Sequence, residues 1–140
     1  IVAANSILGT KAGEAWLEMD YSATPAILFT YPQYGMVGHT EDALKAEGIA
    51  YAKSFGKNLT WPTYRRVGLS NAAYKILVGT DGYYLGAHIL ADNSAGIINT
   101  IRLAMLNRIP VETLYQQSIM SPYPSRESDM LYMLKSLSKK

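Results

Sequence analysis

The chain has 140 residues, a formal net charge of +2 and no cysteine. Its length fits one domain with a hydrophobic core of its own, and its small charge does not indicate nucleic acid or an anionic membrane as a partner. The lack of cysteine excludes a disulfide framework, a thiolate metal site and a thiol nucleophile within these residues, and no apolar run approaches the ~20 residues of a membrane span.

The first residues form an apolar stretch followed by a mixed segment. Ile1, Ala4 and Leu8 recur at a helical spacing, and Gly9 ends it. We therefore expect residues 1–23 to be the end of a helix that begins upstream, followed by a linker. Residues 24–140 are expected to be the domain itself, and the chain is expected to be a fragment of something longer.

Two extended segments and a helix are predicted next. Residues 26–30 form a short apolar strand that Pro32 ends, and residues 34–39 resume extended structure. A helix is expected from Thr40, whose hydroxyl is a good N-cap, to Gly48.

The middle of the chain contains the clearest local unit. Residues 49–55 alternate enough for a strand, and residues 58–62 read as a turn. Residues 72–78 and 83–90 then form two strands around the turn-forming residues 79–82. This pattern predicts a β-hairpin.

The remainder is predicted to be helical. Residues 93–106 carry a strong apolar stripe, a short helix follows Pro110, and a last helix follows Pro124. Strands therefore come first and helices come later. This order predicts an α+β domain, in which an antiparallel β-sheet has helices packed on it.

The sequence SPYPSRESD, residues 121–129, precedes the last helix and allows two interpretations. As a helix entry, its prolines fix the approach and Ser125 caps the helix. Glu127 and Asp129 would then lie in the first turn, where negative charge stabilises by about 0.3–1 kcal/mol. As an active-site loop, the same residues would carry hydroxyls, a guanidinium and carboxylates.

Other candidate sites are weaker. His39 and His88 are the two histidines, and neither has the partner spacing of a metal site, so no metal is expected. We expect His88 to be a satisfied core histidine and His39 to be exposed. Arg65 and Arg66 are expected to be a solvated strand end, and no phosphate-binding or nucleophile motif is present in the sequence.

Three ordered motifs resemble a known family. FTYP at 29–32 followed by VGHTE at 37–41 resembles the FT-x-P-x-x-x-x-VG-x-TE motif. That motif opens the C-terminal dimerisation domain of pyridine nucleotide-disulfide oxidoreductases, the family of glutathione reductase, dihydrolipoamide dehydrogenase and mercuric reductase. YKILV at 74–78, LGAHIL at 85–90 and INTI at 98–101 are similar to the strands and helix that follow in this family.

The resemblance covers nearly the whole chain and implies a function. The fold would be of the FAD/NAD-linked reductase dimerisation-domain type, in a cytoplasmic FAD-dependent NAD(P)H oxidoreductase that forms a homodimer. IVAAN at 1–5 resembles the end of the preceding FAD domain. FAD and NAD(P) would therefore be bound mainly by upstream domains absent from this chain, and the isolated chain would be inactive. The alternatives are a free-standing α+β ligand-binding module and a mercuric-reductase-like member, although the C-terminal cysteine pair of mercuric reductases is missing.

The resemblance also assigns site residues. Dithiol members have a His-Pro-Thr-x-x-Glu segment, whose histidine acts as acid–base on the partner's redox cysteines. Alignment on the proline puts Tyr123 at the histidine, Pro124 at the proline and Ser128 at the glutamate. Tyr123 and Ser128 are thus the candidate catalytic positions, both substituted, while Tyr123 and Pro124 are the candidate contacts with the partner's flavin. A tyrosine base at neutral pH needs a pKa shift of about three units, roughly 4 kcal/mol, so hydrogen bonding or packing is the expected role of Tyr123.

Overall fold

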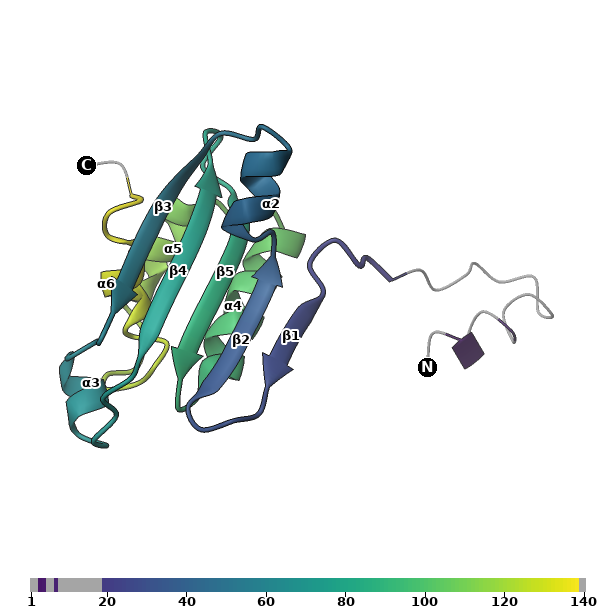
Figure 1. Cartoon of the computed structure of the whole chain (residues 1–140). Coiled ribbons are helices and arrows are strands. Elements are labelled where there is room, and N and C mark those ends of the chain that lie inside the picture. Colours follow the sequence, from purple (N-terminus) through teal and green to yellow (C-terminus); the bar gives the residue numbers. More distant parts are fainter. Residues whose placement is uncertain (1–2, 5–6, 8–18, 139–140) are drawn as a thin grey trace.

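A computed structural model describes residues 3–4, 7 and 19–138 of the chain. One antiparallel sheet and several helices make up the described fold (Figure 1). Its elements, in chain order, are β1 (Pro25–Leu28), β2 (Gln33–Gly38), α2 (Glu41–Ala46), β3 (Tyr51–Lys57), α3 (Pro62–Arg65), β4 (Ala73–Gly79), β5 (Tyr84–Ala91), α4 (Ser94–Leu106), α5 (Val111–Ser118) and α6 (Met130–Leu134).

The sheet has five strands in the order β1-β2-β5-β4-β3, and every neighbouring pair is antiparallel. Figure 1 shows α4, α5 and α6 behind the sheet and α2 in front of it. We call the side that faces α2 the open face. The prediction of an α+β domain with an antiparallel sheet is confirmed.

The core lies between the sheet and α4. Alternate residues of β4, namely Tyr74, Ile76 and Val78, are buried. The stripe predicted on α4 is buried as well and includes Ile97 and Ile101. The predicted hairpin forms as β4 and β5, since its strands alternate locally and its turn residues suit a tight reversal.

The helix α3 begins at Pro62, the last residue of the segment predicted as a turn before β4. Tyr64, the third residue of this four-residue helix, is fully buried. Trp61 packs against Tyr64 and Tyr74. The expectation that Arg65 and Arg66 end a strand was wrong, since Arg65 is the last residue of α3. A single helical turn is too short to show a 3.6-residue period, so the sequence pattern missed it.

The N-terminal expectation falls mostly outside the described residues. Of residues 1–23, the structure describes 3–4, 7 and 19–23. The helix end and linker expected there therefore stay a prediction. Within the described part of the chain, no helix combines the length and the apolar character that crossing a membrane requires.

Candidate functional site

An exposed apolar loop connects α5 to α6, and we call residues 119–125 the apolar tip. The exposed fractions of Ile119, Met120 and Tyr123 are 63%, 84% and 66%. The sequence IMSPYPS contains no charged residue. Large exposed apolar side chains without charges are the composition of a protein interface rather than of an ordinary solvated loop.

Two serines close the end of the apolar tip. The backbone N–H of Ser128 donates to Ser125 Oγ at 3.0 Å, and that of Ser125 donates to Ser128 Oγ at 3.1 Å. The Ser128 hydroxyl donates in turn to the Ser125 carbonyl at 2.7 Å. The expectation that Ser125 caps the last helix was wrong, because α6 begins only at Met130. The two hydroxyls instead stabilise a turn.

Ser128 and Tyr123 are not brought together by this turn. Ser128 is buried and its hydroxyl points at Ser125. Tyr123 projects outward, and we find no side-chain hydrogen bond of Tyr123 within the described residues. The geometry therefore contains no side-chain pair that matches a histidine–glutamate dyad, and the catalytic assignment of both positions stays a prediction.

Charged side chains are buried under the turn. Arg126 Nε and Nη2 donate to Asp92 Oδ1 and Oδ2 at 2.6 and 2.9 Å. Asp129 has no exposed surface, accepts a hydrogen bond from the Thr63 hydroxyl at 2.6 Å, and lies 3.6 Å from Arg126 Nη1. The expectation that Glu127 and Asp129 occupy the first turn of the last helix was therefore wrong.

The pKa values of the two aspartates move in opposite directions. Burial raises the pKa of Asp129, although Thr63 and Arg126 oppose the shift. Hydrogen bonds from Arg126 lower the pKa of Asp92. No sequence pattern could have found this cluster, because its members come from segments far apart in the chain.

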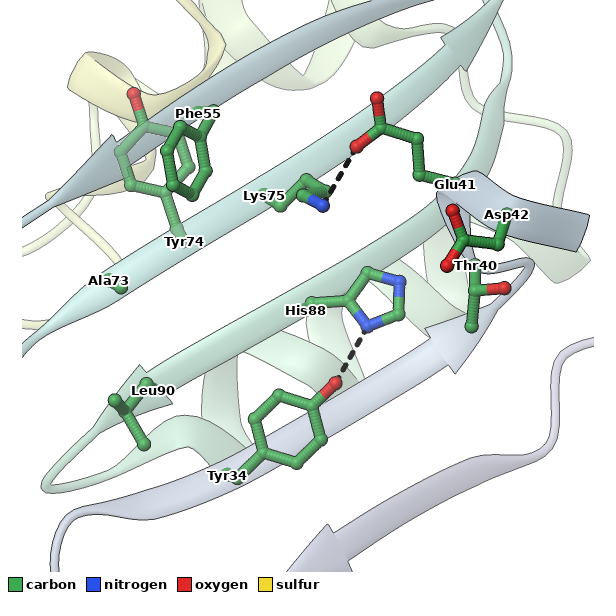
Figure 2. Close-up of a pocket in the computed structure, with 10 residues that line it drawn as sticks. All are labelled: Tyr34, Thr40, Glu41, Asp42, Phe55, Ala73, Tyr74, Lys75, His88 and Leu90. Carbon is green, nitrogen blue, oxygen red and sulfur yellow. Dashed lines mark hydrogen bonds and ion pairs between the residues drawn. The ribbon is translucent and has the colours of Figure 1, made fainter. Parts of the chain in front are cut away.

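A pocket of about 410 Å³ lies on the open face. Figure 2 shows Glu41, which begins α2, reaching over the sheet toward Lys75 of β4. The Glu41 carboxylate accepts hydrogen bonds from Tyr51 at 2.9 Å and from Lys53 and Lys75 at 2.8 Å each. The pocket is lined by polar and aromatic side chains and two small or aliphatic ones: Tyr34, Thr40, Glu41, Asp42, Phe55, Ala73, Tyr74, Lys75, His88 and Leu90.

His88 lies in this pocket, half-buried on the open face, so its predicted place in the core was wrong. Its Nδ1 is 2.9 Å from the Tyr34 hydroxyl and its Nε2 is 3.2 Å from the His39 carbonyl (Figure 2 shows the first contact). Since a carbonyl can only accept, Nε2 carries the hydrogen and Nδ1 accepts from Tyr34. Burial lowers the pKa of His88, which favours this neutral form.

His88 is nevertheless satisfied, as predicted, because both ring nitrogens have partners. His39 is exposed, also as predicted. Thr40 caps α2 through a hydrogen bond from the Ala43 N–H at 3.1 Å, which confirms the expected helix start. Among the described residues, no group of histidines and carboxylates is arranged to hold a metal ion.

Replacing Glu41 with glutamine is expected to remove a pH-dependent part of the stability. Hydrogen bonds from Lys53, then Lys75 and Tyr51, hold the pKa of Glu41 well below its ordinary value. A carboxylate with a lowered pKa contributes stability above the ordinary pKa of about 4.3 and loses it as the pH falls further. In urea unfolding, the difference between wild type and Glu41→Gln should stay constant from pH 7 to about pH 5 and then shrink toward about pH 2.

Asp42→Asn is the control for this experiment, because Asp42 is the neighbouring acid and its side chain is almost fully exposed. It should unfold at the same urea concentration as wild type at each pH. A constant difference between wild type and Glu41→Gln down to the acid end would contradict the prediction.

The glycines of the sheet serve packing rather than phosphate binding. A side chain at Gly86 would meet the backbone of His39, and one at Gly35 would lie 2.8 Å from both Ile27 and Ile98. The described residues thus form no glycine-lined cradle for a nucleotide. These two glycines therefore supply no open backbone for the phosphates of FAD or NAD(P).

Comparison with known proteins decides the family. The model of the pyridine nucleotide-disulphide oxidoreductase dimerisation domain matches residues 24–130. The chain belongs to this family. Its members are oxidoreductases that use FAD and NAD(P), and the matched module is their dimerisation domain.

Relatives of the chain include short and long proteins. An uncharacterized 19.7 kDa protein of the mercuric resistance operon of Staphylococcus aureus is 29% identical over 96% of this chain and 71% of its own length. The dihydrolipoyl dehydrogenase of Chlamydia muridarum is 29% identical over 83% of this chain. The aligned part is only 24% of that dehydrogenase, so the chain spans about a quarter of its length.

Solved structures share the fold. LpdA from Mycobacterium tuberculosis matches 95% of this chain and 29% of its own with a TM-score of 0.81 at 22% identity. The HOCl-induced flavoprotein disulfide reductase RclA from Escherichia coli matches 93% of this chain and 30% of its own with a TM-score of 0.83 at 21% identity. In both proteins the matching part is less than a third of the chain.

Proposed function

We propose that this dimerisation domain joins two copies of a cytoplasmic FAD-dependent NAD(P)H oxidoreductase into a homodimer. The apolar tip would be part of the two-fold interface and would carry Tyr123 and Pro124 toward the flavin of the partner. Residues 1–23 would be the end of the preceding FAD domain and a linker. FAD and NAD(P) would be bound by upstream domains, so the chain alone would have no reductase activity.

The observation that carries this proposal is the apolar tip itself. It exposes Ile119, Met120 and Tyr123 in a segment that contains no charged residue, yet its base is fixed by hydrogen bonds and ion pairs. Interface cores are rich in aromatic residues and methionine and poor in charge. A projecting surface of this composition on a domain of the dimerisation family is well suited to insert into a partner.

Tyr123 would act in this interface as a packing ring and a hydrogen-bond donor. Its exposed position leaves the phenol free to reach a group on the partner. Ser128 would act only through the turn that it closes with Ser125. Acid–base chemistry at neutral pH is assigned to neither, since an ordinary phenol titrates near 10 and a serine hydroxyl does not titrate.

Sedimentation equilibrium of the chain tests the proposal. We expect a dimer with a dissociation constant on the order of micromolar or tighter, which corresponds to roughly 8 kcal/mol of binding free energy. Absorbance should show no bound flavin, and no NAD(P)H oxidation should occur with artificial electron acceptors. A chain that stays monomeric at roughly 50 µM would contradict the proposal, because it would leave less than about 6 kcal/mol for association.

The pocket on the open face favours a second candidate, a free-standing ligand-binding module. Its volume of about 410 Å³ lies within the range of small-molecule sites, and Tyr34, Phe55, Lys75 and His88 line it. Shifts of the His88 ring signals in NMR titrations with small aromatic acids, for a chain that stays monomeric, would favour this candidate over dimerisation.

The Staphylococcus relative favours a mercuric-reductase-like member as a third candidate, since it is encoded in a mercuric resistance operon. The chain itself has no cysteine with which to bind mercury. The discriminating observation is the open reading frame around it: a C-x4-C motif upstream would indicate a dithiol enzyme. A metal-binding cysteine pair elsewhere in the same polypeptide would favour the mercuric type.

A further inference from the structure

One guanidinium joins separate segments of the chain beneath the apolar tip. Arg126 follows the tip directly and donates two parallel hydrogen bonds to Asp92, which lies between β5 and α4. Its Nη1 lies 3.6 Å from Asp129 Oδ2. The exposed side-chain fraction is 9% for Arg126 and 1% for Asp129, so these are buried charges rather than a surface ion pair.

A further segment is connected to the same cluster. The Thr63 hydroxyl, in α3, donates to Asp129 Oδ2 at 2.6 Å. The Arg126 guanidinium also stacks over the ring of Tyr64, 4.0 Å from the ring centroid. The turn after β5, the helix α3 and the end of the apolar tip thus converge on one side chain.

The cluster contributes little to the free energy of unfolding. Asp129 Oδ1 and the Tyr64 hydroxyl are buried and have no hydrogen-bond partner within the described residues. Two carboxylates face one guanidinium, and taking such charges out of water costs several kcal/mol per ion before their attraction offsets it. Apolar side chains of similar size would serve stability at least as well, so stability alone does not account for the cluster.

The cluster does fix the relative orientation of the segments that it joins. A planar guanidinium held bidentately by a carboxylate fixes both distance and angle, which an apolar contact does not. The apolar tip itself has few backbone hydrogen bonds: Ile119, Met120 and Ser121 are bonded back to the end of α5, and Ser125 is bonded to Ser128. Its orientation relative to the sheet therefore depends on what anchors Arg126.

We propose that Arg126, held by Asp92 and Asp129, is the positioning residue of the apolar tip and fixes the direction in which Tyr123 and Pro124 project. The consequence for dimer formation rests on the proposed function. The ordering of the tip does not, because it is a property of the single chain. Arg126 and Asp129 are almost fully buried and Asp92 lies at the rim, so the role we assign to the cluster is to orient the tip.

Amide hydrogen exchange in Asp92→Ala and Arg126→Lys tests the proposal directly. Asp92→Ala removes both oxygens that accept the paired hydrogen bonds of Arg126. Arg126→Lys keeps the positive charge but loses the planar guanidinium. In both, the Ser125 and Ser128 amides are expected to exchange at least about tenfold faster, because hydrogen bonds to charged groups are the strong ones. The amides of Ile76 and Ile89, in the middle of the sheet, should keep their exchange rates.

Lys53→Met is the matched control, since it breaks a 2.8 Å ion pair with Glu41 on the open face. It should leave the Ser125 and Ser128 amides unchanged. A second readout is the dimer dissociation constant, which should rise at least about fivefold in Asp92→Ala and stay unchanged in Lys53→Met. Restoring the carboxylate as Asp92→Glu should recover part of the slow exchange.

The outcomes separate the two proposals. If wild type dimerises but Asp92→Ala leaves tip exchange unchanged, the positioning role is overturned while the proposed function stands. If all amides speed up together, the cluster acts on global stability and the positioning role is again overturned. If wild type is monomeric, the proposed function fails, and the exchange measurement still decides the positioning role. Should Arg126→Lys not fold, Asp92→Ala decides, because Asp92 lies at the partly exposed rim.

Discussion

Replacing Tyr123 with serine is expected to raise the dimer dissociation constant by about 30-fold or more. Two thirds of this ring is exposed in the single chain, at the centre of an apolar and uncharged tip. Buried aromatic anchors of an interface typically contribute 2 kcal/mol or more on truncation, and about 1.4 kcal/mol corresponds to a factor of ten. Sedimentation equilibrium over a range of concentrations measures the constant.

Two variants control this experiment. Tyr123→Phe keeps the ring and should stay within about fivefold of wild type, since one solvent-competing hydrogen bond contributes only about 1 kcal/mol. Tyr21→Ser removes an equally exposed tyrosine that lies outside the apolar tip, and it should not change the constant. Equal weakening by Tyr21→Ser and Tyr123→Ser would contradict a specific role for the tip. A large effect of Tyr123→Phe would instead indicate that the hydroxyl makes the decisive contact.

Replacing Gly86 with alanine is expected to lower the free energy of unfolding by about 3 kcal/mol, near the upper end for overpacking. The added Cβ would collide with the His39 carbonyl oxygen and lie 3.0 Å from the His39 nitrogen. These are backbone atoms at the point where β2 leads into α2. They are also fixed by a hydrogen bond from His39 N–H to the Leu85 carbonyl at 2.8 Å, so they cannot move aside without breaking this link between the end of β2 and β5.

Gly79→Ala is the matched control at the end of the neighbouring strand. Its Cβ would approach the Asp81 carboxylate at 2.7 Å, which is the movable end of a side chain. The expected loss is below about 1 kcal/mol, typical of a contact that can relax. Urea unfolding of both variants checks the prediction. It would be contradicted if Gly86→Ala were as stable as Gly79→Ala.

The open face shows that alternation in a strand predicts on which face of the sheet a residue lies, but not whether another element covers it there. β5 was predicted as the return strand of the hairpin, and His88 lies on the face opposite Ile89. Its apolar sequence neighbours indicated a core position, yet α2 covers only part of that face. His88 therefore lies at a pocket and pairs with Tyr34. How far a helix extends over a sheet depends on tertiary packing, which alternation does not encode.

The last helix shows that residue types alone do not fix where a helix begins. Ser125, Glu127 and Asp129 fit a helix entry by residue type, because caps and first turns prefer such side chains. The helix starts several residues later, since Ser125 and Ser128 close a turn on each other and Asp129 is buried against Thr63. The same side chains could have capped a helix or made contacts elsewhere in the fold, and in the structure they make those contacts.

The α+β class, the β4–β5 hairpin, the apolar stripe of α4 and the cap at Thr40 could all be predicted from the sequence. All of these depend on residues within a few positions of one another, where periodicity and turn chemistry act. Its ordered motifs also indicated the family. Three features became visible only in the folded chain: Arg126 joins Asp92 and Asp129 under the apolar tip, Tyr64 of α3 is buried, and Glu41 binds two lysines. Apart from the Arg126–Asp129 pair, the ion pairs among these contacts join residues 12 to 34 positions apart, and their energy exists only once the sheet has brought the segments together.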